Sequence, residues 1–170
     1  MAEAWIENLA QDIKQRNREA AEEYGRAQHC DGVIADRGKS FFVVLVSCLQ
    51  EDVDALRHQL QGDLVSTDTS LQTVKPDEVK ITRARFPWVD ARLIHREDTI
   101  VLDYAKGLGV AGDPEMDRKT QTYTFQVAPD DMLFLEDAFD EPPQRYTQPE
   151  ELARQIMETL FRAEHSSSAK

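Results

Sequence analysis

The first part of the chain mixes apolar and charged residues with a helical period. Between residues 3 and about 28, apolar side chains recur at spacings of three, four and seven, with charges between them. They are Ile6, Leu9, Ile13, Ala20 and Tyr24. The stretch from Arg16 to Glu19 has no apolar side chain. We therefore expect an amphipathic helix that docks only loosely at its middle.

A second helical stripe follows residues 29–39, which contain two glycines and are predicted to be a connection. Its apolar positions step by three or four, as one face of a helix does. They are Phe42, Leu45, Leu49, Val53, Leu56 and Leu60. Ser40 is the expected N-cap and Gly62 the expected C-terminal stop. The pattern thus predicts two separate N-terminal helices.

The middle of the chain shows the alternation of strands. A polar stretch from Asp63 to Asp77 holds one candidate edge strand, 64–67. Beyond it, the predicted strands are 79–86, 91–96, 99–105, 120–127 and a shorter one at 132–136. The connections at 87–90 and 97–98 are too short for a crossover helix, which needs a dozen residues or so. These strands are therefore expected to pair antiparallel as a meander.

The last helix has a clear start signal. Thr147, Pro149 and Glu150 match a capping box with proline in the first turn, and an apolar stripe follows from Leu152 to Phe161. The predicted fold is a single α+β domain over residues 1–163. It has two N-terminal helices, an antiparallel meander of four to six strands and a C-terminal helix packed on the sheet. Residues 164–170 are expected to form a disordered polar tail.

Charge narrows the range of partners. The 170 residues include 32 acidic and 20 basic ones, a formal net charge of −12. Such a field repels phosphate groups, which disfavours nucleic acids and anionic membranes as partners. The N-terminus lacks the pattern of a signal peptide, and the longest apolar run, 41–46, is far below the ~20 residues of a membrane span. We therefore expect a cytoplasmic protein.

Two glycine motifs resemble phosphate loops only superficially. Residues 107–112 spell G-x-G-x-x-G, but Pro114 follows and a strand is expected by about Thr120, which leaves no room for the required helix. Gly38, Lys39 and Ser40 precede a helix without an upstream parallel strand. We interpret the first motif as a hairpin loop and the second as a helix cap. No cofactor is predicted.

Metal ligands and catalytic sets are not evident in the sequence. The four histidines, at positions 29, 58, 95 and 165, are scattered, and no zinc-type spacing occurs, so no metal site is predicted. An enzyme would need residues that meet only in the folded chain, for instance His95 with Asp103 or Tyr104.

Four arginines and one acidic segment are the remaining candidates. Arg83 and Arg85 alternate on one predicted strand, and Arg92 and Arg96 on the next; paired guanidinium groups bind carboxylates or phosphates. The alternative is pairing with nearby acids across the strands. The acidic segment contains Asp130, Asp131, Glu136, Asp137, Asp140 and Glu141.

Three functional hypotheses follow. The leading one is a small acidic, non-enzymatic interaction or regulatory domain, either homodimeric or bound to one protein partner through the sheet face or the acidic segment. The second is a domain that binds a small anionic ligand through the arginines. The third is an enzyme whose site assembles only in three dimensions.

Overall fold

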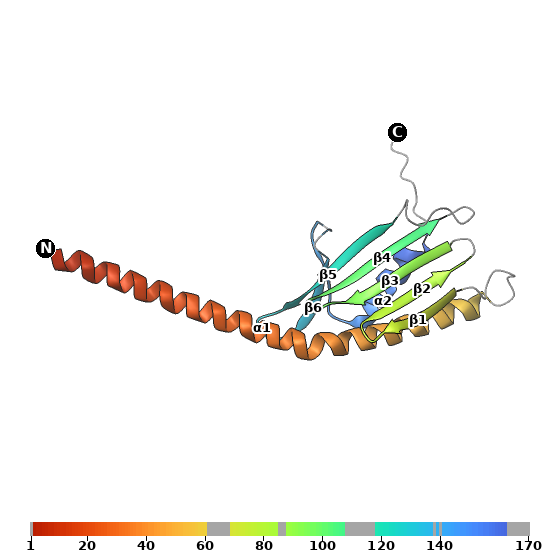
Figure 1. The fold of residues 1–170 in the computed structure, drawn as a ribbon, viewed down its shortest axis with the longest axis horizontal. Coiled ribbons are helices and arrows are strands. Elements are labelled where there is room, and N and C mark those ends of the chain that lie inside the picture. The colour runs from red at the N-terminus through yellow and green to blue at the C-terminus, as the bar shows by residue number, and fades with distance from the viewer. Residues whose placement is uncertain are drawn as a thin grey trace, which may run out of the picture.

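One very long helix, a seven-stranded sheet and a short final helix make up the fold (Figure 1). The computed structural model describes residues 2–60, 69–84, 88–107, 118–137, 139 and 141–162. The helices are α1 (Ala2–Gln59) and α2 (Pro149–Phe161). The strands are β1 (Thr69–Lys75), β2 (Glu78–Arg83), β3 (Trp88–His95), β4 (Thr99–Gly107), β5 (Lys119–Val127), β6 (Leu133–Asp137) and β7 (Gln144–Tyr146).

The prediction of two N-terminal helices is wrong, because α1 continues without a break through residues 29–39. A glycine costs a helix only about 1 kcal/mol, which tertiary packing readily offsets. Gly38 is buried against the sheet, and a Cβ there would lie 3.4 Å from the Phe125 ring, an ordinary van der Waals contact. Ser40 lies inside the helix and is therefore not an N-cap.

All seven strands pair antiparallel with their neighbours in chain order, which confirms the meander. The strand count exceeds the predicted four to six because β1 and β7 were missed. β1 is largely exposed and polar, and β7 has only three residues, so neither shows a clear alternation. β4 and β5 pair antiparallel, as the hairpin interpretation of residues 107–112 requires. Residues 61–68, with the candidate strand at 64–67 and Gly62, lie outside the described residues, as does the tail at 164–170.

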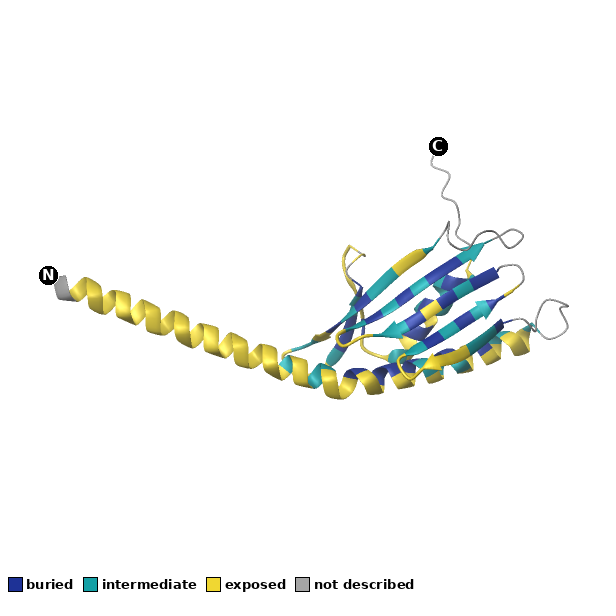
Figure 2. Ribbon diagram, viewed as in Figure 1, coloured by how far each residue is buried: buried dark blue, intermediate teal, exposed yellow. Residues whose placement is uncertain are grey.

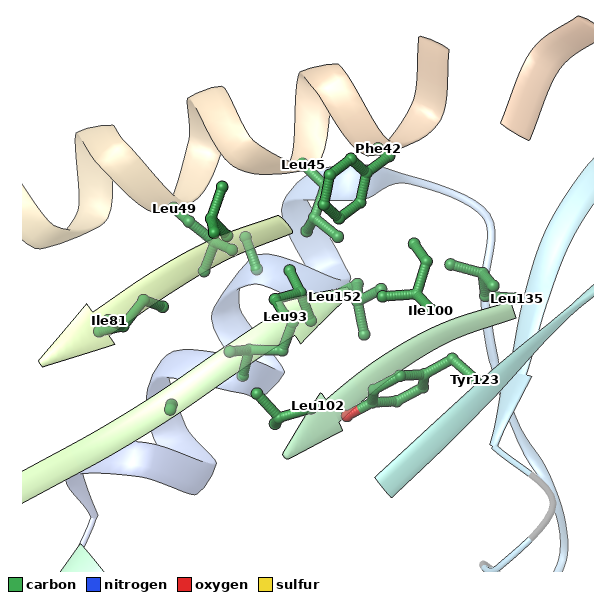
Figure 3. Packing of buried hydrophobic residues seen from close by; sticks show 14 of the residues in the cluster. Phe42, Leu45, Leu49, Ile81, Leu93, Ile100, Leu102, Tyr123, Leu135 and Leu152 are labelled. Atoms are coloured by element: carbon green, nitrogen blue, oxygen red, sulfur yellow. The ribbon is translucent and has the colours of Figure 1, made fainter. Parts of the chain in front are cut away.

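Both helices lie on one face of the sheet and enclose the core (Figure 3). The second half of α1 contributes Phe42, Leu45 and Leu49, and α2 contributes Leu152 and Ile156. The alternate residues of the strands meet them; among these are Ile81, Leu93, Ile100, Leu102, Tyr123 and Leu135. α2 begins one residue later than the capping box implies: Gln148 is its N-cap and makes no side-chain cap bond.

The first half of α1 leaves the body and runs alone into solvent (Figure 2). Every residue from 4 to 29 is exposed, whereas the core positions of α1 begin at Phe41. We call residues 4–29 the arm and the remaining described residues the body. The expectation that the N-terminal stripe docks on the protein's own core is wrong, since the arm contacts no strand.

Trp88 covers Gly107 on the sheet face opposite the helices. The two residues are paired across β3 and β4, and Trp88 is buried. A Cβ built on Gly107 would lie 2.1 Å from the indole Nε1 of Trp88 and 2.6 Å from its Cζ2. No side chain fits at position 107 unless the indole moves.

We predict that Gly107→Ala lowers the free energy of unfolding by about 1–3 kcal/mol, because the new methyl group overpacks the indole. Urea unfolding followed by circular dichroism measures the change. Gly32→Ala is the matched control: a Cβ there meets nothing within 4 Å, so stability should stay equal or rise by about 1 kcal/mol. A Gly107→Ala variant as stable as the control would contradict the observed contact.

Candidate functional site

The arm carries an apolar stripe that no described part of the chain covers. Its exposed fractions are 59% for Trp5, 52% for Ile6, 49% for Leu9 and 51% for Ile13, against 0% for Leu45 and Leu49 in the docked half of the same helix. An isolated helix in water is only marginally stable, and most helix stability in proteins comes from packing an amphipathic face. The stripe is therefore an apolar helix face with no packing contact among the described residues.

The charges of the arm are sorted into blocks along the helix. Glu7 and Asp12 form a first acidic block. Lys14, Arg16 and Arg18 form a basic block, and Glu19, Glu22 and Glu23 form a second acidic block. Within the described side chains of these blocks, the structure shows one local hydrogen bond, in which Gln15 donates to Glu19. The arm thus presents a patterned electrostatic surface beside its apolar stripe.

The base of the arm is held by the loop between β5 and β6. His29 Nε2 lies 2.8 Å from a carboxylate oxygen of Asp131, and Arg37 donates to the carbonyl oxygen of Asp131 at 2.8 Å. Asp131 has a left-handed backbone with a φ of 62°. These contacts join α1 to the sheet where the arm ends and the body begins.

An open groove of about 560 Å³ runs between the C-terminal half of α1 and α2, on the side away from the sheet. Leu56, Met157 and Phe161 are among its apolar residues, and Glu51, Asp52, Glu150 and Glu158 are its acids. Partial burial, helped by Glu51, raises the pKa of the Asp52 carboxyl; Arg154 opposes the rise. Partial burial and the acids Glu150, Glu51 and Asp52 also raise the pKa of the Cys48 thiol, which disfavours a reactive thiolate.

The outer face of the sheet carries an ion-pair network across β2, β3 and β4. Asp90 lies 3.1 Å from Lys80 and 3.2 Å from Arg118, and Arg118 also contacts Asp103 at 3.0 Å. Partial burial disfavours ionised Asp90, but hydrogen bonds from Lys80 and Arg118 outweigh it and lower the pKa. Because these charges are paired with one another, this face offers little to a charged ligand.

The arginines predicted as ligand-binding residues do not converge. Arg83 points to the helix side, is buried and donates to Thr69 Oγ1 at 3.2 Å. Arg92 lies on the opposite face and reaches 3.9 Å from Glu78. Arg96 is exposed in the turn after β3, and Arg85 lies outside the described residues.

The predicted acidic segment is largely occupied within the body. Asp131 holds the base of the arm, and Glu136 accepts a hydrogen bond from Arg145 at 3.0 Å. Asp137 is buried and accepts from the side chain of Gln121 and the backbone of Phe139. Asp140 lies outside the described residues.

His95 does not meet the groups proposed for catalysis. It points inward, stacks on Phe42 at 5.4 Å and meets the Phe125 ring edge-on at 5.9 Å. Its Nε2 has no hydrogen-bond partner among the described residues. Asp103 lies on the opposite face of the sheet, and Tyr104 pairs with Ala91, four residues along β3 from His95. The hypothesised catalytic pairs are therefore not formed.

Similarity to known proteins gives no guide to the function of this chain. No family model, curated protein or solved structure matches this chain. Over the part of the chain that the structure describes, three or more metal-ligating side chains nowhere gather, and no helix has the length and apolarity to cross a membrane. The spacing of the apolar residues predicted the arm's stripe, but the prediction placed this stripe against the protein's own core. The stretch Arg16–Glu19, which has no apolar side chain, was the signal in the sequence against such docking.

We predict that the protein loses stability as the pH falls from 7 to 5, in part through His95. Burial lowers the pKa of His95 in the folded state; nearby Asp77 opposes this and Lys39 adds to it. Below about pH 6.5 the unfolded chain takes up a proton that the folded state resists, so the free energy of unfolding decreases. The His95 share of this loss should grow as the pH falls from 6.5 towards 5.

Urea unfolding of His95→Phe at pH 7 and 5 tests this share. The variant should lose less stability between the two pH values than the wild type does. His58→Asn is the control, since His58 is exposed on α1. Equal pH dependence in wild type and His95→Phe would contradict the prediction.

Proposed function

We propose that this protein is a non-enzymatic interaction module whose docking element is the arm. The proposal is carried by one observation, the apolar stripe of Ile6, Leu9 and Ile13 on a helix exposed over all of residues 4–29. Burying such side chains contributes about 1.5–3 kcal/mol each. A partner that covers the stripe therefore gains a substantial part of a binding free energy.

The contacts of the described residues favour the arm as the docking element over the acidic segment and the outer sheet face. Three carboxylates of the acidic segment make contacts inside the body, those of Asp131, Glu136 and Asp137. The outer sheet face pairs its main charges in the network around Arg118. The described part of the acidic segment exposes two large apolar side chains, Met132 and Phe139, whereas the arm exposes five, of which Ile6, Leu9 and Ile13 form one stripe.

The two alternative hypotheses find less support. Arg83 and Arg92 face opposite sides of the sheet, so they cannot clamp one anionic group. His95 sits beneath α1 among aromatic rings, apart from Asp103, and contributes to core packing. An interaction module needs neither feature.

We predict that Leu9→Ser combined with Ile13→Ser abolishes association while leaving the body folded. The two substitutions remove the centre of the stripe and touch no body contact, so the melting temperature of the body should change by less than about 2 °C. Sedimentation velocity of the pure protein, together with affinity capture from the native host, measures association.

Val43→Ser with Val44→Ser is the matched control, since these valines are exposed on the body part of the same helix at 55% and 44%. The control should associate like the wild type. If the arm variant also associates normally, the arm is not the docking element. A Met157→Glu variant that then loses association would assign docking to the groove between α1 and α2.

A further inference from the structure

We propose that the partner covering the arm is the arm of a second copy of this chain, laid antiparallel against the first. The inference deepens the proposed function and rests on it. Two features of the arm support antiparallel pairing: the order of its charge blocks and the spacing of its apolar stripe.

The charge blocks favour two antiparallel copies over two parallel ones. In a parallel pair in register, each acidic block and the basic block lie beside their like. In an antiparallel pair that crosses near Gln11, the first acidic block of each arm lies beside the basic block of the other. Packed helix axes are about 8–10 Å apart, close to the screening length at physiological salt, so facing blocks interact.

The apolar stripe fits the same crossing point. Ile6, Leu9, Ile13, Arg16 and Ala20 step alternately by three and four residues, the spacing of a two-helix seam. With the crossing near Gln11, Leu9 of each copy faces Ile13 of the other. Ile6 then faces the aliphatic stem of Arg16, whose guanidinium extends toward the partner's Glu7 and Asp12.

This crossing explains why an arginine interrupts the stripe. In a helix docked on its own core, Arg16 would leave a buried cation without a partner. In the antiparallel pair its charge meets the first acidic block. The second acidic block lies at and beyond the end of the overlap: Glu19 falls opposite Glu3, and Glu22 and Glu23 have no residue of the other arm opposite them.

The arm is long enough to keep the two bodies apart. From Gln11 to the base of the arm at His29, the helix rises by about 27 Å. The bodies would therefore lie at opposite ends of the paired arms, roughly 55 Å apart. No clash between bodies opposes the pairing, and the groove and the outer sheet face stay open in both copies.

Block reversal in the full-length protein tests the pairing. One variant carries Glu7→Lys with Asp12→Lys; the second carries Lys14→Glu, Arg16→Glu and Arg18→Glu; the third carries all five changes. Wild type should sediment at twice the 19.4 kDa chain mass. The first two variants should dissociate with a Kd raised about 10- to 100-fold, because like blocks then face each other.

Charge complementarity between the two arms should be restored in two ways. An equimolar mixture of the first two variants should form heterodimers, and the fully swapped variant should form homodimers again, with affinity that falls as salt rises. Far-ultraviolet circular dichroism of every variant checks that the arm remains helical. Failure of both the mixture and the swapped variant to recover would overturn the inference.

Orientation is measured by spin labels at residue 28 in a chain with Gln28→Cys, Cys30→Ser and Cys48→Ser. Antiparallel arms place the two labels about 50 Å apart, whereas parallel arms place them within about 10–20 Å. A short distance would overturn the antiparallel arrangement.

The outcomes also separate this inference from the proposed function. A wild-type monomer at 100 µM that still captures a partner through Leu9 and Ile13 would sink the self-pairing and leave the arm as a docking element. A dimer that persists in Leu9→Ser with Ile13→Ser would sink both.

Discussion

The contact between the second half of α1 and the sheet is the constraint on which the rest of the structure depends. Phe42, Leu45 and Leu49 bury their side chains against the strands, and Gly38 lies beside the Phe125 ring. Because α1 has no break, this contact also sets the direction of the arm. The His29 and Arg37 contacts to Asp131 support the helix where it leaves the body. The unbroken helix therefore points its free half away from the body.

The two faces of the sheet differ in their side chains and in what covers them. The inner face is apolar and is covered by both helices, with α2 closing the core beside α1. On the outer face, Arg118 forms ion pairs with Asp90 and Asp103, and Trp88 covers Gly107 where β3 begins and β4 ends. Of the ten large apolar side chains that are exposed among the described residues, five lie on the arm, where Ile6, Leu9 and Ile13 form one stripe. This stripe is the physical basis of the proposed function.

The candidate residues show why a polar pattern is a weak guide to a site. Arg83 and Arg92 belong to neighbouring strands, yet the pleat sends them to opposite faces, one buried beside Thr69 and the other exposed near Glu78. His95 and Asp103 are separated in the same way across β3 and β4. The acidic segment has carboxylates that the fold itself uses. Contacts inside the body engage Arg83 and the carboxylates of Asp131, Glu136 and Asp137, whereas Arg96 is exposed after β3.

Local pattern alone determined the antiparallel meander, the C-terminal helix and the amphipathic character of both halves of α1. These features depend on residue spacing and on connections too short for crossovers, which are properties of neighbouring residues. Only the tertiary structure decided that α1 is continuous, that β1 and β7 extend the sheet, and that the stripe of Ile6, Leu9 and Ile13 stays outside the core. The reason is that a glycine's cost and an apolar face's destination both depend on what packs against them, and those contacts join residues far apart in the chain.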